Sequence, residues 1–119
     1  MLNFSSARIL LCVAPTDMRK SFDGLAALVR EHLKSDPLSG AWFVFRNRRG
    51  DRLKILCWDT DGFSIWQKRL EEGSFEFPKL EADAVGVSIL SSDLALILGG
   101  IDLASAKRRK RFKLERQAG

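Results

Sequence analysis

Several residue types that build catalytic and metal sites are scarce in this sequence of 119 residues. It holds one histidine, His32, and two cysteines, Cys12 and Cys57. A Ser-His-Asp triad would need an unusual base here, and zinc sites favour clustered cysteine and histidine ligands with a CxxC spacing that this sequence lacks. The GxSxG, GxGxxG and phosphate-loop patterns are also missing. The sequence therefore predicts no catalytic residue, no metal site and no cofactor.

Long hydrophobic runs are missing as well. No run approaches the roughly 18 apolar residues of a membrane span, and residues 1–6 lack the basic flank and apolar stretch of a secretory signal. We therefore expect a cytoplasmic protein without membrane contact. Because Cys12 and Cys57 each lie inside an apolar run, we expect both thiols to be reduced and buried rather than joined in a disulfide.

Charge is distributed unevenly along the chain. Residues 107–119 carry seven basic residues and one acidic residue, whereas residues 1–106 carry 13 basic and 14 acidic residues. The length suits a single globular domain, which we assign to residues 1–106, followed by a basic, flexible tail over 107–119. Such a tail suits a polyanion such as DNA, and its candidate contacts are Lys107, Arg108, Arg109, Lys110, Arg111 and Lys113.

Hydrophobic periodicity predicts an α+β fold. Apolar spacing of three and four predicts one main helix over residues 22–33, and a short C-terminal helix over 93–98 is expected after Ser91 or Ser92 as cap. Apolar or alternating runs predict strands at 8–13, 42–45, 53–58, 63–70, 74–77 and 85–89. We expect an antiparallel β-meander of about four to six strands, with the helices packed on one face.

Basic residues gather near one predicted hairpin tip, where Gly50 supplies the positive φ that the turn needs. Further basic pairs come just before the first helix and at the end of a later strand. The candidate binding residues are Arg19, Lys20, Arg46, Arg48, Arg49, Arg52, Lys68 and Arg69. They fit a solvated turn that discourages aggregation, or a surface that contacts phosphates or an acidic partner. The sequence alone leaves both interpretations open.

Other residue groups have two interpretations of their own. Trp42, Trp58 and Trp66 fall in predicted strands, where they suit either a stacking platform for single strands or, as we favour, an ordinary core. Asp59 and Asp61 belong to a predicted turn, where aspartate is common. A metal-dependent nuclease would need carboxylates clustered on strands, which two aspartates in a turn do not supply, so a nuclease is the least favoured function.

Five ordered motifs together resemble the accessory TnpB protein of the IS-sixty-six family of bacterial insertion sequences. They are TDMRKSFDGL at 16–25, DPLSG at 36–40, FVFRNRRGD at 43–51, WDTDGF at 58–63 and KRLEEGSF at 68–75. The resemblance spans roughly residues 8 to 103. It implies a protein encoded beside a separate DDE-type transposase and needed for efficient transposition. It supplies no catalytic residue, and it does not extend to the larger RNA-guided nucleases that share the name.

The leading hypothesis is a non-catalytic accessory protein for DNA transposition that binds DNA, the transposase of its element, or both. The main alternative is a protein–protein interaction module that does not contact DNA. A small metal-dependent nuclease is the third candidate. The sequence does not predict the oligomeric state.

Overall fold

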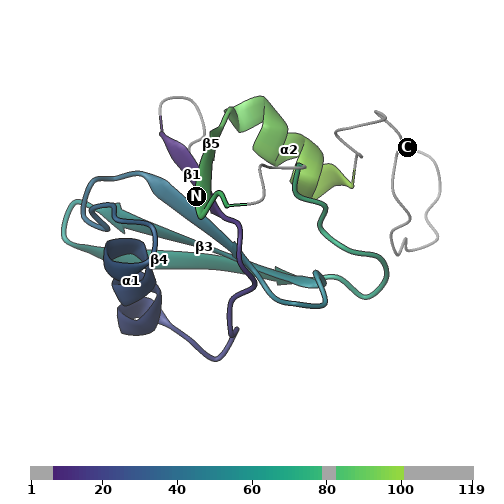
Figure 1. Cartoon of the computed structure of the whole chain (residues 1–119), viewed down its shortest axis with the longest axis horizontal. Coiled ribbons are helices and arrows are strands. Elements are labelled where there is room, and N and C mark those ends of the chain that lie inside the picture. The colour runs from purple at the N-terminus through teal and green to yellow at the C-terminus, as the bar shows by residue number, and fades with distance from the viewer. Residues whose placement is uncertain (1–6, 79–82, 101–119) are drawn as a thin grey trace.

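The computed structural model describes residues 7–78 and 83–100 of the chain. Five strands form one sheet in the order β4-β3-β2-β1-β5, accompanied by two helices (Figure 1). The strands are β1 (Ile9–Cys12), β2 (Trp42–Arg46), β3 (Arg52–Asp59), β4 (Gly62–Arg69) and β5 (Gly86–Ile89), and the helices are α1 (Phe22–Glu31) and α2 (Ser91–Gly99). The predicted α+β class, with one main helix and a C-terminal helix, is confirmed.

The pairing of β1 departs from the predicted meander. Strands β2, β3 and β4 pair antiparallel through short turns, and β5 adds antiparallel to the free side of β1. However, β1 and β2 run parallel, with Leu10 opposite Phe43, because α1 carries the chain back to the end at which β1 began. The expectation of a wholly antiparallel sheet is therefore wrong for this one pair.

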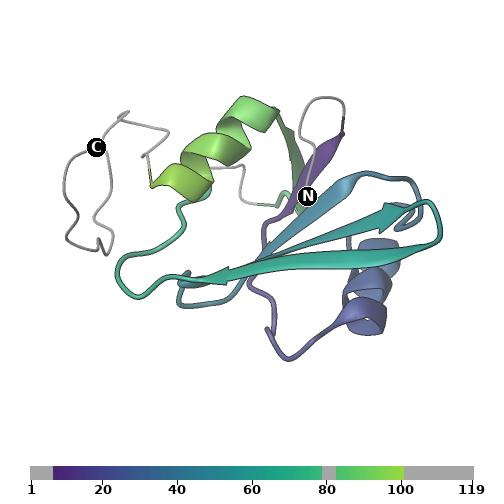
Figure 2. The same ribbon diagram turned by 180° about the vertical axis from the view of Figure 1, so that it is seen from behind.

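The two helices cover opposite faces of the sheet (Figure 1, Figure 2), so the expectation that they share one face is wrong. Leu25 and Val29 of α1 pack against Phe43 on one face. Leu94 and Ile97 of α2 belong to the core on the other face. The physical reason lies in the central strands, which are buried at consecutive positions and therefore need cover on both sides.

The segment at 74–77 is not the strand that its alternating pattern predicted. Phe75 and Phe77 are nonetheless buried in the core beneath α2, with 1% and 7% of their surfaces exposed. The Phe75 N–H donates to the Gly50 carbonyl at 2.7 Å, which ties the segment to the β2–β3 turn. The alternation thus reflects two anchoring side chains rather than a strand of the sheet.

Two local expectations, one about the β2–β3 turn and one about the start of α2, have mixed outcomes. Gly50 has φ +77°, the left-handed conformation that the turn was expected to need. The predicted serine cap of α2 is wrong, since Leu90 occupies the cap position and its N–H donates to the Asp93 carboxylate at 3.1 Å. Gly100, with φ +82°, ends α2 in the left-handed conformation that is common after a helix.

The core contains most of the residues expected there. Trp42 is buried, and Trp66 packs against the same cluster beneath α2. Trp58 packs edge to face on Phe63, with ring centroids 5.1 Å apart. Both cysteines are free. Cys12 is buried on the α1 face, whereas Cys57 is half-buried on the α2 face, so the sheet separates the two thiols. Only Cys12 shows the full burial predicted for both.

Candidate functional site

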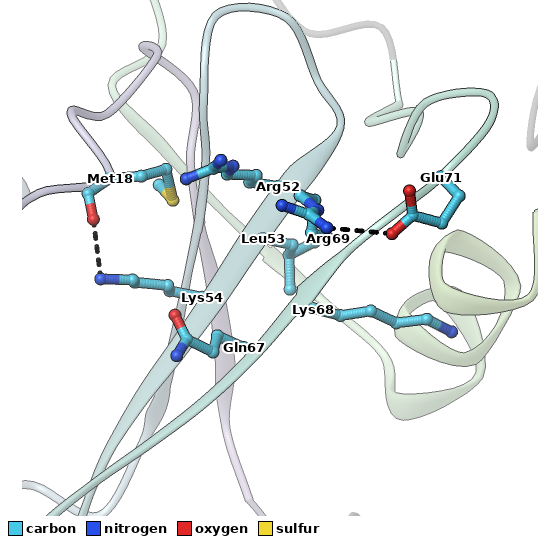
Figure 3. A pocket seen from close by; sticks show the side chains of 8 residues that line it. All are labelled: Met18, Arg52, Leu53, Lys54, Gln67, Lys68, Arg69 and Glu71. Carbon is cyan, nitrogen blue, oxygen red and sulfur yellow. Dashed lines mark hydrogen bonds and ion pairs between the residues drawn. The ribbon is translucent and has the colours of Figure 1, made fainter.

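Two hollows adjoin at the end of the sheet where the β2–β3 turn lies. One, of about 380 Å³, lies over the paired ends of β3 and β4 (Figure 3). The other, of about 430 Å³, lies between that turn and the loop that follows β1. Met18 and Arg52 line both hollows. We call the combined surface the basic groove, because its charged lining consists of Arg19, Arg48, Arg49, Arg52, Lys54, Lys68 and Arg69, with Asp17, Asp51 and Glu71.

The basic groove polarises a domain that is otherwise balanced in charge. Seven basic and three acidic side chains line it, which gives a net charge of +4. The rest of residues 7–78 and 83–100 carries five basic and nine acidic side chains, a net charge of −4. The positive charge of the described domain is therefore concentrated at this end of the sheet, where it raises the local concentration of anions.

Four cations of the basic groove are free of ion pairs within the described part of the chain. The side chains of Arg48, Arg49, Arg52 and Lys68 have no carboxylate oxygen within 4.0 Å there, and all four residues are exposed. Unpaired guanidinium groups offer forked N–H donors that suit phosphate and carboxylate oxygens. These side chains are thus available to an anionic partner without first breaking an internal pair. Lys68, however, is the cross-strand partner of buried Leu53, so its side chain leaves the opposite face of the sheet from Arg52.

Arg19 is paired with a neighbouring carboxylate. Its Nη2 donates to Asp17 Oδ2 at 2.7 Å, its Nε lies 3.1 Å from both oxygens, and its backbone N–H donates at 2.9 Å. The hydrogen bonds from Arg19 hold the pKa of Asp17 at about 2, well below its usual value. Exposed pairs of this kind contribute little to stability, so Asp17 mainly reduces the charge that Arg19 presents.

The other two carboxylates of the basic groove also have partners. Asp51 accepts a hydrogen bond from Asn47 Nδ2 at 2.7 Å, which is the main cause of its lowered pKa. Glu71 accepts one from Arg69 Nη2 at 3.1 Å, and both side chains are 60% exposed. The acids of the groove are therefore few and already engaged.

Lys54 is a residue of this site that the sequence analysis did not single out. Its Nζ donates to the Met18 carbonyl at 2.8 Å (Figure 3) and to the Lys20 carbonyl at 2.7 Å. These two bonds join β3 to the loop before α1, which lies more than 30 residues earlier in the chain. The sign of this role in the sequence is a single lysine inside the otherwise apolar predicted strand 53–58.

Arg46 lies apart from the other arginines of the hairpin. Its Nη1 donates to the Phe75 carbonyl at 3.1 Å, and its guanidinium carbon lies 4.1 Å from the centroid of the Phe77 ring. Burial lowers the pKa of Arg46, against an opposing attraction from Glu76. Arg46 thus holds the segment at 75–77 in place, and it does not line the basic groove.

The structure therefore gathers six of the predicted binding residues, which are Arg19, Arg48, Arg49, Arg52, Lys68 and Arg69. Arg46 and Lys20 do not line the groove, although the Lys20 carbonyl takes part in its construction. The tail candidates Lys107, Arg108, Arg109, Lys110, Arg111 and Lys113 lie outside the described residues, as does the domain boundary at 106. Those assignments stay predictions.

Two further features bear on the predicted classes of function. Within residues 7–78 and 83–100, no three or more His, Cys, Asp or Glu side chains gather as metal ligands would. Neither helix of that region has the length and apolar character that a membrane crossing requires.

Comparison with known proteins places the chain in a family. Residues 7–108 match the family described as IS66 Orf2 like protein. Two proteins of Sinorhizobium fredii (strain NBRC 101917 / NGR234) are similar, both described as uncharacterized. The one named y4jC is 38% identical over 86% of each chain, and the one named y4hO is 40% identical over 82% of this chain and 83% of its own. No solved structure matches. The chain belongs to the IS66 Orf2-like family, whose members are accessory proteins of insertion sequences.

Proposed function

We propose that this member of the family is a non-catalytic, cytoplasmic accessory protein of DNA transposition that binds duplex DNA through the basic groove. The observation that carries the proposal is the set of unpaired arginines in that groove, Arg48, Arg49 and Arg52. The predicted tail, residues 107–119, adds further positive charge to the same chain. Binding releases counterions condensed on the DNA, and that release supplies most of the sequence-independent affinity.

Binding of duplex DNA by the groove should weaken with salt concentration by a calculable amount. Each phosphate that the protein neutralises contributes about −0.9 to the slope of log K against log salt for duplex DNA. Three contacts in the groove, from Arg48, Arg49 and Arg52, therefore account for roughly −2.7, and contacts from the tail make the slope steeper. Because phosphates carry no base identity, this part of the affinity is largely independent of sequence.

The test is a salt titration of binding to a mixed-sequence duplex, with Arg48→Ala/Arg49→Ala compared with the wild type. The slope is expected to become less negative by about 2, and affinity to fall. Stability should change by less than about 0.5 kcal/mol, because both residues are exposed. The matched control, Arg8→Ala/Arg30→Ala, removes the same charge outside the groove. Equal losses in the two double variants would contradict a specific role of the groove.

The tail is tested separately by ending the chain after Ser105. If the tail contacts DNA, the slope of log K against log salt becomes less negative by about 4 or 5 in the truncated protein, while the variants in the groove keep their effect. An unchanged slope and affinity would remove the tail from the DNA interface.

The second candidate partner is the transposase of the same element. The same unpaired guanidinium groups fit carboxylates on an acidic protein surface as well as phosphates. Co-purification with the transposase, with and without terminal DNA of the element, separates the two partners. Capture that persists without DNA and is lost in Arg48→Ala/Arg49→Ala favours the protein partner.

A further inference from the structure

The register of the sheet places two arginines face to face. Arg52 of β3 is the direct cross-strand partner of Arg69 of β4. The Leu70 N–H donates to the Asp51 carbonyl at 2.8 Å, so the next pair, Arg52 and Arg69, is of the non-hydrogen-bonded kind. Side chains of such a pair leave the same face of the sheet and start closest together. The side chains of Arg52 and Arg69 therefore begin side by side in the hollow over β3 and β4.

Like charges directly opposite each other destabilise a pair of strands, and the surroundings offset this repulsion only in part. Arg52 is attracted by the nearby Asp51 carboxylate, which contributes to the lowered pKa of Asp51. No carboxylate of the described residues pairs with Arg52. Glu71 pairs with Arg69, but both side chains are largely exposed, so the pair is weak and readily exchanged. An anion bound between the two guanidinium groups would remove the repulsion.

The surroundings of this pair have the form of a binding site. The hollow of about 380 Å³ lies within the size range of small-ligand pockets. Figure 3 shows Arg52 reaching toward Met18 on one side and Arg69 reaching toward Glu71 on the other. Met18 is itself fixed, because its carbonyl accepts a hydrogen bond from Lys54. The guanidinium groups of Arg52 and Arg69 point apart in this structure, and both residues are exposed, so each side chain must turn toward the other to hold one anion.

We propose that Arg52 and Arg69 together form a seat for one phosphate group, to which each guanidinium donates forked N–H bonds. Charge-assisted bonds of this type are the strong ones, and arginine forks match phosphate oxygens in geometry. This assignment deepens the proposed function, on which it rests for the source of the phosphate, the backbone of duplex DNA. A free phosphate-bearing molecule offers the same chemistry, so the experiment has two arms.

The first arm measures thermal unfolding of the full chain with and without inorganic phosphate, at ionic strength held constant with chloride. A ligand that binds only the folded state raises Tm with its concentration. The wild type is expected to gain Tm in phosphate, and Arg52→Gln to lose that gain. Without phosphate at low salt, the variant should unfold about 1–4 °C higher, because the repulsion is gone.

Arg8→Gln is the matched control, since it removes an exposed arginine that does not line the groove. It also reports the general stabilising effect of phosphate on any protein. Arg69→Gln is the second variant, and it is expected to behave as Arg52→Gln does. The seat is overturned if the wild type gains no more Tm in phosphate than Arg52→Gln does.

The second arm measures binding of a duplex to the same variants. If Arg52→Gln loses the phosphate response and also binds the duplex about tenfold more weakly, both the seat and its DNA source are supported. Loss of the phosphate response with unchanged duplex affinity supports a seat for a free phosphate-bearing ligand and counts against DNA at this position. The failure of the seat and the failure of the proposed function are therefore told apart.

Discussion

Replacing Lys54 with methionine tests how the basic groove is built. Methionine keeps an unbranched apolar side chain at this half-buried position but cannot donate to the carbonyls of Met18 and Lys20, which lie 2.8 and 2.7 Å from the ammonium nitrogen. Those two hydrogen bonds join the loop 16–20 to β3. We therefore expect Lys54→Met to loosen this loop while the sheet stays folded.

The size of the effect follows from the two bonds. A hydrogen bond from a charged donor contributes roughly 1.5–3 kcal/mol. Here both carbonyls belong to a surface loop, so water replaces much of what is lost, and we expect a total of about 1–2 kcal/mol. Such a change multiplies the population of the opened loop by roughly 5 to 30. Arg19 is then no longer held beside the groove, and duplex affinity falls as well.

Limited trypsin digestion measures the opening, because Arg19 and Lys20 are cleavage sites within the loop. Cleavage there is expected to accelerate about tenfold in Lys54→Met, in line with the opening population. Cleavage after Arg30 in α1 reports on wider unfolding and should change little. Lys68→Met is the matched control, since it removes a lysine of the neighbouring strand whose side chain makes no hydrogen bond or ion pair within residues 7–78 and 83–100. Equal cleavage rates in wild type and Lys54→Met would refute the reasoning.

Three further predictions concern separate parts of the domain. Asp17→Asn should raise duplex affinity by releasing Arg19. The pKa of Asp17 is held at about 2, so the ion pair with Arg19 is complete above roughly pH 4 and is lost only as pH falls through 2. Measurements of the free energy of unfolding between pH 5 and 8 should therefore show no pH dependence from this pair. Gly50→Val should lower the free energy of unfolding by about 1–3 kcal/mol in denaturant titrations, since φ is +77° and Ser74 Cβ would lie 3.4 Å away. In thiol labelling of the native protein, Cys57 should react faster than the buried Cys12, and both slowly near neutral pH, because burial raises both pKa values.

The sequence predicted the elements of the fold better than their arrangement. Strong apolar runs gave β1 and the strands of the hairpins, and helical spacing gave α1, because these patterns are local. The parallel pairing of β1 with β2 was missed because nothing local encodes a strand's neighbour. The segment at 75–77 was misjudged because two buried phenylalanines one residue apart look the same in a strand and in an anchored loop.

The residues of the candidate site were likewise predicted only in part. The arginines of the β2–β3 turn could be predicted because they lie together in the sequence. Lys54 and Met18 meet across 36 residues, and only the packing of the loop before α1 onto the sheet brings them together. Arg46 shows the opposite error, since a place in the basic cluster of the sequence did not put it in the groove.

The facing arginines, by contrast, follow from the β3–β4 turn alone. That turn pairs Asp59 with Gly62, and an unbroken antiparallel ladder then pairs each earlier residue with the next later one until Arg52 meets Arg69. A slip of one residue would separate them, but it would also turn the buried side chains Leu53 and Ile55 to solvent. The core therefore enforces this repulsion, and the two arginines lie in the basic groove. The phosphate seat that we propose would give their pairing a physical reason.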